Sequence, residues 1–414
     1  MRTVHTANDL KIMQSLPLDI KIRMSKRRIR DWIEFYGEEG VYIAWSGGKD
    51  STVVRHLVRQ EYPDAVSVFS NTGLEYPEVR RFVQAAKDRG EPVEILRPSM
   101  RFDEVIKKYG YPIISKEVSE KIRKARGNIR DGNYSLRLCQ LGVMPDEYGG
   151  LKVDERYDYF ATAEGSKFEV KKYRPLLDVD FLISDECCWE MKKSVMIEYE
   201  ERTGRAPILG MMASESRKRQ QGWMKTGCNA FESDRPQSNP IAFWTDQDIL
   251  QYIRRYELEI PSVYGEIVYA EEPGQMRLEE VTGDYIGCDK LCTTGCHRTG
   301  CIFCAYGDHL QKGRDRFLKL RETHPRQYAY CIGGGEFAWI GWIKTPKKWE
   351  RLEFVTADGQ PMTPEQIDAF VSIHKDNENY IFDKAWQPNK NGLGLGYVFD
   401  ELNRIYGDGF IVYQ

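Results

Sequence analysis

The residues best suited to chemistry form a glycine-rich turn, Ser46-Gly47-Gly48-Lys49-Asp50-Ser51. An apolar run at 41–45 precedes the turn and predicts a buried strand, and apolar residues at helical spacing follow it. Such a turn exposes backbone N–H groups at the start of a helix, where the helix dipole also favours an anion. Lys49 would add positive charge, and the hydroxyls of Ser46 and Ser51 would add hydrogen bonds. The turn therefore predicts a phosphate site, although its glycine–lysine spacing differs from that of the GxxxxGK[ST] P-loop.

Cysteines form the second group of residues suited to chemistry. The chain has 10 of them, with two adjacent at 187–188 and five between 288 and 304. Adjacent cysteines pair poorly with each other, but they can ligate one polynuclear cluster. Two kinds of metal site stay open: zinc held by four thiolates, or an iron–sulfur cluster. The zinc candidates are Cys292, Cys296, Cys301 and Cys304, and the further candidates for a cluster are Cys139, Cys288 and Cys296.

The elements that must position these residues alternate between strand and helix. Apolar runs at 65–69, 92–96 and 206–211 predict further strands, and the spacing between them is typical of βαβ units. Parallel strands carry ligands at their carboxyl ends, so Asn71-Thr72-Gly73 is expected on the same rim as the glycine-rich turn. The sequence predicts an α/β fold with a doubly wound, mostly parallel sheet, a Cys-rich cluster-binding region and a small C-terminal appendage.

Composition limits the class of protein. Hydrophobic residues make up 41% of the chain and charged residues 30%, and the net charge is −3. These values are typical of a soluble protein and exclude a globally basic nucleic-acid binder. No run of about 18 apolar residues predicts a membrane span, and residues 1–19 do not resemble a signal peptide. We therefore expect a cytoplasmic protein, whose reduced, clustered cysteines serve a metal or catalytic role.

Basic residues concentrate in two stretches, 21–30 and 116–137. Many of them alternate with apolar residues at helical spacing, so a solvated helix face is the simpler interpretation of each stretch. The alternative is contact with an anionic substrate, such as a nucleic-acid backbone.

The glycine-rich turn resembles the pyrophosphatase loop, SGGxDS, of the adenine-nucleotide alpha-hydrolase (PP-loop) superfamily. That superfamily includes sulfonucleotide reductases, ATP sulfurylases, tRNA-thiolating enzymes and DNA-phosphorothioation enzymes. The run at 239–253 resembles a signature of phosphoadenylyl-sulfate (PAPS) reductases. The resemblance implies an adenine nucleotide, either ATP or a sulfonucleotide (adenylyl sulfate or phosphoadenylyl sulfate), bound with Mg²⁺, and it implies catalytic roles for Lys49 and Asp50. The implied nucleotide-binding residues are Ser46, Gly47, Gly48, Lys49, Asp50, Ser51, Asn71, Thr72, Gly73, Glu215, Ser216, Arg217 and Arg219.

The cysteine spacing resembles the [4Fe–4S] ligand set of assimilatory adenylyl-sulfate reductases, with zinc as the alternative metal. The implied ligands are Cys187, Cys188, Cys301 and Cys304. We expect four regions along the chain. They are a basic helical segment (1–38), a nucleotide-binding α/β domain (39–270), a Cys-rich region (271–335) and an α/β appendage (336–414).

Two activities are compatible with this superfamily. A sulfonucleotide reductase attacks sulfate with a cysteine on a C-terminal tail, but the family's Glu-Cys-Gly-Leu motif is not found after Cys331, which leaves Cys228 or Cys331 as its nucleophile. A thiolase-type enzyme adenylylates its substrate, releases pyrophosphate and lets sulfur displace AMP. We expect the second activity, with tRNA or DNA as substrate, a sulfur-donor protein such as a cysteine desulfurase as partner, and no membrane. The further alternative is a regulatory module that binds nucleotide without turnover.

Overall fold

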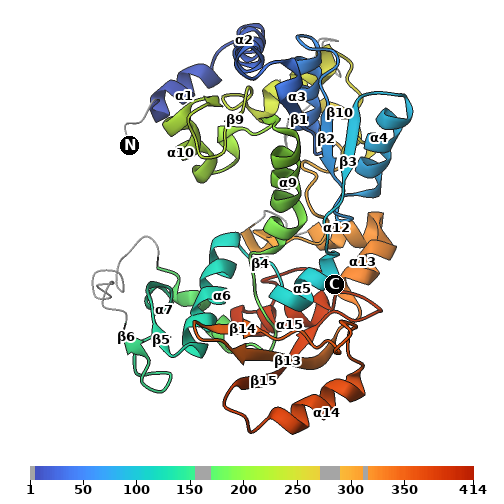
Figure 1. The fold of residues 1–414 in the computed structure, drawn as a ribbon. Helices are drawn as coiled ribbons and strands as arrows, with labels where there is room; N and C mark the ends of the chain where they lie inside the picture. Colours follow the sequence, from blue (N-terminus) through green and yellow to red (C-terminus); the bar gives the residue numbers. More distant parts are fainter. Residues whose placement is uncertain (1–4, 154–168, 271–289, 311–315) are drawn as a thin grey trace. The chain divides into compact units, whose positions relative to one another are not determined.

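The computed structural model describes residues 5–153, 169–270, 290–310 and 316–414. The chain divides into two compact units (Figure 1), and each unit is built from two separate segments of sequence. Residues 1–99 and 191–302 form the first unit, and residues 100–190 and 303–414 form the second.

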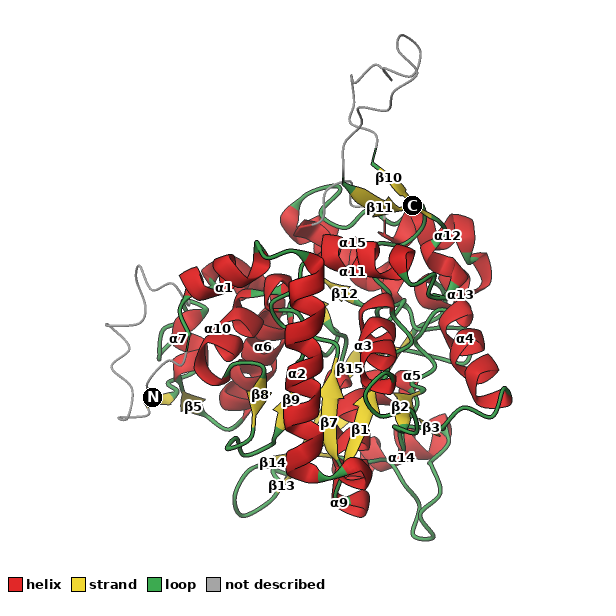
Figure 2. Ribbon diagram, turned by 90° about the horizontal axis from the view of Figure 1, so that it is seen from above, coloured by secondary structure: helices red, strands yellow, loops and turns green. Residues whose placement is uncertain are grey.

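The first unit contains a six-stranded sheet in the order β3-β2-β1-β7-β9-β8. Every neighbouring pair in it is parallel except β8 and β9, which are antiparallel. Figure 2 shows these strands side by side. The chain moves outward from β1 to β2 and β3 and later returns on the other side of β1 as β7, so the sheet has a switch point between β1 and β7. The strands are β1 (Val41–Ala44), β2 (Ser67–Ser70), β3 (Val93–Leu96), β7 (Ala206–Leu209), β8 (Asn229–Ala230) and β9 (Gln237–Ser238).

Helices cover both faces of this sheet. Alternate residues of a strand point to opposite faces, and in β1 both sets are apolar. Val41 and Ile43 belong to the large core that also contains the apolar residues of α2 and α3, whereas Tyr42 packs against Tyr199 of α9, with ring centroids 5.0 Å apart. The predicted doubly wound, mostly parallel α/β sheet is confirmed. The helices of this unit are α1 (Ala7–Gln14), α2 (Leu18–Tyr36), α3 (Lys49–Arg59), α4 (Pro77–Asp88), α9 (Ser194–Thr203), α10 (Arg217–Thr226) and α11 (Asp246–Arg255). Two further strands, β10 (Ile267–Tyr269) and β11 (Leu291–Thr293), pair with each other antiparallel.

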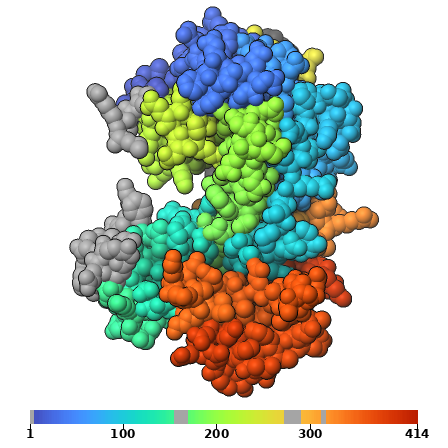
Figure 3. All heavy atoms as spheres, in the orientation of Figure 1, coloured from blue at the N-terminus to red at the C-terminus, as the bar shows by residue number. Residues whose placement is uncertain are grey.

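The second unit joins the middle of the chain to its C-terminal quarter, drawn in teal and in orange to red in Figure 3. Its main sheet is antiparallel, in the order β14-β13-β15, and β12 pairs with β4. The guanidinium of Arg126 donates to four backbone carbonyls between residues 176 and 181, which fixes that loop against α6. The helices are α5 (Phe102–Tyr109), α6 (Lys116–Arg130), α7 (Leu136–Gln140), α12 (Arg316–Thr323), α13 (Pro325–Ile332), α14 (Pro364–His374) and α15 (Leu395–Tyr406). The strands are β4 (Ile113–Ile114), β5 (Asn133–Tyr134), β6 (Lys152–Val153), β12 (Ala305–Tyr306), β13 (Glu336–Lys344), β14 (Trp349–Arg351) and β15 (Tyr380–Gln387).

Among the helices that the structure describes, none is long and apolar enough to cross a membrane.

Candidate nucleotide-binding site

The glycine-rich turn connects β1 to α3 at the switch point of the sheet. Gly47 has a φ of +71°, and a Cβ at this position would lie 2.7 Å from Cγ1 of Val79. Both features exclude a larger residue, because L-residues disfavour this φ and the neighbouring helix leaves no space. A Cβ on Gly48 would lie 3.0 Å from Oγ1 of Thr299 and 3.2 Å from the hydroxyl of Tyr264. Steric contacts therefore favour glycine at each of the two positions.

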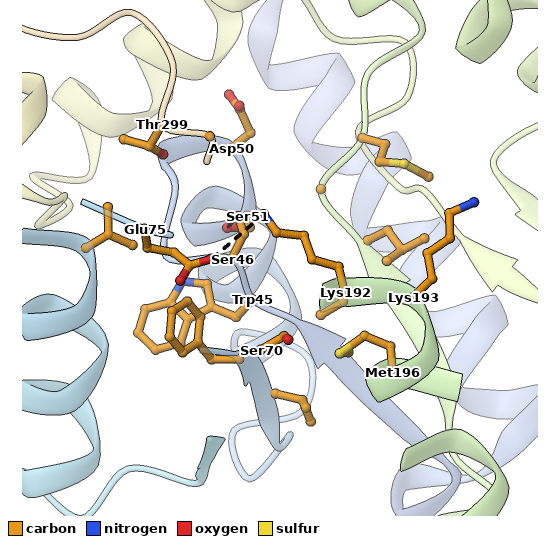
Figure 4. Close-up of a pocket in the computed structure, with 18 of the residues that line it drawn as sticks. Trp45, Ser46, Asp50, Ser51, Ser70, Glu75, Lys192, Lys193, Met196 and Thr299 are labelled. Carbon is orange, nitrogen blue, oxygen red and sulfur yellow. Dashed lines mark hydrogen bonds and ion pairs between the residues drawn. The ribbon is translucent and has the colours of Figure 1, made fainter. Parts of the chain in front are cut away.

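A cavity of about 450 Å³ opens beside this turn, at the carboxyl ends of β1, β2 and β7. Its apolar wall comes from the strands and from α9, whereas its polar wall comes from the glycine-rich turn and the start of α3, from the segments that follow β2 and β7, and from Lys192 and Lys193 just before α9 (Figure 4). This volume and mixed lining suit a small organic ligand with an anionic end. The apolar lining residues include Trp45, Phe69, Met196 and Leu209, and the polar ones include Ser46, Asp50, Ser51, Ser70, Glu75, Lys192, Lys193, Glu215, Arg219, Arg235 and Thr299.

Two hydroxyls of the turn lie together at the cavity. Ser46 Oγ is 3.0 Å from Ser51 Oγ, and the Ser51 hydroxyl can also donate to the carbonyl of Gly48 at 3.0 Å. Both serines line the cavity. Ser51 lies in the first turn of α3 and Ser46 lies three residues before that helix begins, at the end where backbone N–H groups and the helix dipole favour an anion.

Lys49 adopts a position that the sequence does not predict. Its ammonium is 2.8 Å from Oδ1 of Asp50 and 3.3 Å from Oδ1 of Asp246, and only 3% of the residue is exposed. Burial by itself lowers the pKa of Lys49, but Asp50 and Asp246 outweigh that effect and raise it. Asp50 lines the main cavity, whereas Lys49 lines a second cavity of about 410 Å³ together with Cys292 and other residues. Lys49 therefore holds the Asp50 carboxylate through an ion pair and does not itself line the main cavity.

The Asn71-Thr72-Gly73 element is connected to the cavity through the side chain of Glu75. The Thr72 hydroxyl donates to Oε1 of Glu75 at 2.7 Å and the Thr72 N–H donates to Oε2 at 3.1 Å. Asn71 accepts the N–H of Gly73 at 3.2 Å, which closes the turn. None of these three residues is among those that line the cavity, but Glu75 is, and Lys192 reaches it from the opposite side with Nζ 3.8 Å from Oε1 (Figure 4). Glu75 is the residue through which this element reaches the cavity.

Of the four predicted nucleotide-binding residues that follow β7, two line the cavity and two do not. Glu215 and Arg219 line the cavity and form an ion pair with each other, and Glu215 also accepts the N–H of Met212 at 3.0 Å. Burial and the nearby Arg298 lower the pKa of Arg219, while Asp50 opposes that effect. Ser216 caps α10 by accepting the N–H of Arg219 at 3.2 Å, and Arg217 is exposed outside the cavity lining. Arg219 is thus the cation that this element presents to the cavity.

Three of the four predicted cluster ligands share one neighbour in the second unit. The Sγ atoms of Cys187 and Cys188 are 4.0 Å apart. Burial, followed by the charges of these two thiols and of Cys304, raises the pKa of Tyr306. Cys301 belongs to the first unit. Within the described residues, no three His, Cys, Asp or Glu side chains are arranged to hold a metal ion.

The remaining cysteines separate by burial and location. Cys139, Cys228 and Cys331 are buried, and Cys292 and Cys296 are partly exposed. Burial raises the pKa of the Cys228 thiol and raises that of Cys331 well above its ordinary value. Cys288 lies outside the described residues.

The two basic stretches are largely held by ion pairs within the chain. In α2, Lys21 is buried and bonded to Asp248, and Lys26 and Arg30 both pair with Glu61. In α6, acidic residues of the same unit pair with Lys121, Arg123 and Lys124. Charges that pair with protein carboxylates are less available to phosphates, so these contacts favour the structural interpretation of both stretches.

The residues that sequence reasoning missed come from distant segments. Lys192 and Lys193 follow the adjacent cysteines, Arg235 precedes β9, and Thr299 precedes Cys301. The single signal available for them was the basic pair Lys192-Lys193, close after the two adjacent cysteines.

Comparison with known families identifies the chain. It matches the family model of the phosphoadenosine phosphosulfate reductase domain over residues 40–306, and it therefore belongs to that family, as the sequence motifs predict. Curated protein sequences gave no match.

Two solved structures are similar at 13% sequence identity. The phosphate complex of phosphoadenylyl-sulfate (PAPS) reductase from Candida auris aligns with 60% of this chain and 91% of its own, with a TM-score of 0.32. The U34-tRNA thiolase NcsA from Methanococcus maripaludis, solved with its [4Fe–4S] cluster, aligns with 58% of this chain and 66% of its own, with a TM-score of 0.26. Because both TM-scores are below 0.5, neither similarity adds to what the family match shows.

Proposed function

We propose that this protein binds ATP in the cavity at the β1–β7 switch point and transfers AMP to an oxygen of its substrate. In that reaction the substrate oxygen bonds to the α-phosphorus while the bond to pyrophosphate breaks. A sulfur nucleophile then replaces the adenylylated oxygen and AMP leaves. The observation that carries the proposal is the placement of Ser46, Asp50 and Ser51 at one cavity with Lys192 and Arg219.

The cavity supplies separate surroundings for the two ends of a nucleotide. Its apolar wall, which includes Trp45 and Phe69, suits a planar base, whereas the turn and the start of α3 suit phosphates. Lys192 and Arg219 would exchange their ion pairs with Glu75 and Glu215 for contacts with the phosphates and would stabilise the negative charge that develops on the departing pyrophosphate. Asp50 would hold Mg²⁺, which is usually bound through one or two carboxylates and the phosphates and which neutralises the phosphate charge when bound.

A [4Fe–4S] cluster remains part of the proposal, with Cys187, Cys188, Cys301 and Cys304 as its ligands. The charges of three of these thiols all act on one residue, Tyr306, which supports it. When bound, such a cluster would supply a site for sulfur, and zinc at the same cysteines is the alternative. Iron and acid-labile sulfide, measured on anaerobically purified protein, distinguish the two metals.

The proposed acceptor is tRNA or DNA, and the proposed sulfur source is a donor protein such as a cysteine desulfurase. On α2, Arg27 and Arg28 pair with Asp31 at 3.7 Å, and Arg27 is largely exposed. Their side chains are 76% and 41% exposed, so both could reach a phosphate backbone. If Arg27→Glu with Arg28→Glu leaves tRNA and DNA binding unchanged, α2 is not the contact surface.

The burial of two cysteines argues against the sulfonucleotide reductase that we consider as the alternative. A nucleophilic cysteine must be a thiolate and must be accessible. Cys228 and Cys331 are both buried with a raised pKa, so neither is prepared for attack on sulfate. A regulatory module, the second alternative, would bind ATP without ever releasing pyrophosphate.

Pyrophosphate release tests the proposal directly. The assay contains ATP, Mg²⁺ and either tRNA or DNA, and compares the wild type with Asp50→Asn, which keeps the side-chain size and removes the charge. A matched control is Asp88→Asn, on the exposed surface of α4. We expect release by the wild type and the control and a loss of at least tenfold in Asp50→Asn, because catalytic metal ligands contribute several kcal/mol to the transition state, about tenfold per 1.4 kcal/mol. Equal release by Asp50→Asn would exclude the role of Asp50, and no release by the wild type would favour the regulatory module.

A further inference from the structure

We infer that Tyr264 positions the glycine-rich turn and that Thr299, bonded to Tyr264, contacts the bound nucleotide. The inference rests on the proposed function and adds two residues to its site. Tyr264 ends a short 3₁₀ turn, Ser262–Tyr264, and only 1% of it is exposed. Its hydroxyl accepts the N–H of Lys49 at 3.0 Å and lies 2.8 Å from Oγ1 of Thr299.

The bond to Lys49 engages the first amide of α3. A helix cannot satisfy the N–H groups of its own first turn, so these groups need side chains, water or a ligand. The hydroxyl of Tyr264 takes the first of them, and the next two residues of the helix, Asp50 and Ser51, line the cavity. Tyr264 therefore fixes the start of the helix whose following residues face the ligand.

The Tyr264 hydroxyl also explains why the second glycine of the motif, Gly48, cannot easily be a larger residue. A Cβ on Gly48 would lie within 3.0–3.2 Å of the Thr299 and Tyr264 hydroxyls, which is closer than side chains normally approach. The glycine-rich turn is consequently packed tightly against the hydroxyls of Tyr264 and Thr299. Burial raises the pKa of Tyr264, so its hydroxyl keeps its proton and can donate to Thr299 while it accepts from Lys49.

Backbone hydrogen bonds hold Thr299 in place from both sides. On one side, the N–H groups of Gly295 and Cys296 donate to the carbonyls of Tyr264 and Val263, each at 2.9 Å. On the other side, the N–H of Ile302 donates to the carbonyl of Leu74 at 2.8 Å, in the loop that carries Glu75. Thr299 lines the cavity between these anchors, close to Asp50 in Figure 4. A nucleotide bound to the turn would therefore meet the Thr299 side chain.

A double-mutant cycle tests the inference. Tyr264→Phe and Thr299→Val each remove one hydroxyl and keep the shape, and calorimetric titration with ATP–Mg²⁺ measures the affinity of each variant and of the double variant. Tyr252→Phe is the matched control, because this fully buried tyrosine of the same unit bonds to His56 and does not line the cavity. We expect each single variant to bind ATP about three- to tenfold more weakly, the usual effect of one hydrogen bond. The double variant should bind ATP more weakly than either single variant. Its fold-loss of affinity should nevertheless be smaller than the product of the two single fold-losses.

Hydrogen exchange at the amide of Lys49 supplies a second readout that loss of packing would not mimic. We expect faster exchange in the peptide that contains Lys49 for Tyr264→Phe and unchanged exchange for Tyr252→Phe. If Tyr264→Phe does not fold, Thr299→Val carries the test by its ATP affinity. Wild-type affinity in both single variants, or effects that multiply in the double variant, would overturn the inference while the proposed function stands. A wild type that binds no ATP would overturn both.

Discussion

Replacement of Lys21 by methionine tests whether the basic helix α2 is a structural element or a substrate-binding surface. Lys21 is 2% exposed, and its ammonium donates to the carbonyl of Gln14 at 2.6 Å and to both carboxylate oxygens of Asp248 at 2.7 and 2.8 Å. Asp248 is 6% exposed and lies in the first turn of α11. The pair therefore joins two helices inside the first unit. Methionine keeps the length of the side chain but leaves the Asp248 carboxylate without its counter-charge.

The expected loss of stability depends on the hydrogen bonds that Asp248 retains in the Lys21→Met variant. Removal of one partner of a buried ion pair costs about 3–5 kcal/mol, because the other charge stays buried without compensation. The carboxylate of Asp248 still accepts the N–H and hydroxyl of Thr245 at 2.7 and 2.8 Å, so we take the lower end, about 3 kcal/mol. For a folded unit of this size, such a change lowers the melting temperature by about 6–12 °C.

Thermal unfolding followed by circular dichroism measures this loss. The control is Lys26→Met on the same helix, where the ammonium is 3.1 Å from Glu61 and partly exposed. Such a pair contributes at most about 1 kcal/mol, so the control should melt within about 4 °C of the wild type. If Lys21→Met melts like the wild type and also weakens nucleic-acid binding, then Lys21 is a substrate contact and the structural interpretation of α2 is wrong.

Three further changes test other parts of the account. Gly47→Ala should destabilise the first unit by about 2–4 kcal/mol in urea unfolding, because it combines a positive φ with overpacking against Val79, and an unchanged midpoint would contradict the described turn. Burial by itself raises the pKa of Glu91, but the hydrogen bonds and charges of Arg55, Arg59 and Arg89 outweigh burial and lower that pKa from 4.5 to about 2. The wild type should therefore lose stability as the pH falls from about 4.5 toward 2, Glu91→Gln should lose less, and parallel acid-unfolding curves would exclude the effect. Cys188→Ser with Cys301→Ser, prepared anaerobically, should lose most of its iron and sulfide, and full retention would refute the proposed ligand set.

Local sequence patterns were sufficient to predict the sheet and the turn. An apolar run predicts β1 because both faces of a parallel strand are buried, and two glycines before a helical pattern predict the turn at its end. The N-terminus of α11 was predictable in the same way, since Thr245 caps the helix and Asp248 completes a capping box. Each of these features depends on residues within a few positions of one another.

The contacts between distant segments were not predictable. The sequence gives the charge of Lys49 but not the direction of its side chain, which is set by Asp246 in another helix. Tyr264 bonds to the turn across 215 positions, and nothing in its own surroundings marks it. The two compact units are also discontinuous in sequence, so a division made along the chain cannot identify them. The predicted region boundaries and the roles of the site residues stay predictions.

The measurement that tests the central claim most directly is a calorimetric titration of anaerobically purified protein with ATP–Mg²⁺ and, separately, with phosphoadenylyl sulfate. The proposed adenylylation predicts much tighter binding of ATP, weakened in Asp50→Asn, and pyrophosphate release when tRNA or DNA is added. A clear preference for phosphoadenylyl sulfate would contradict the account and would identify the protein as a sulfonucleotide reductase.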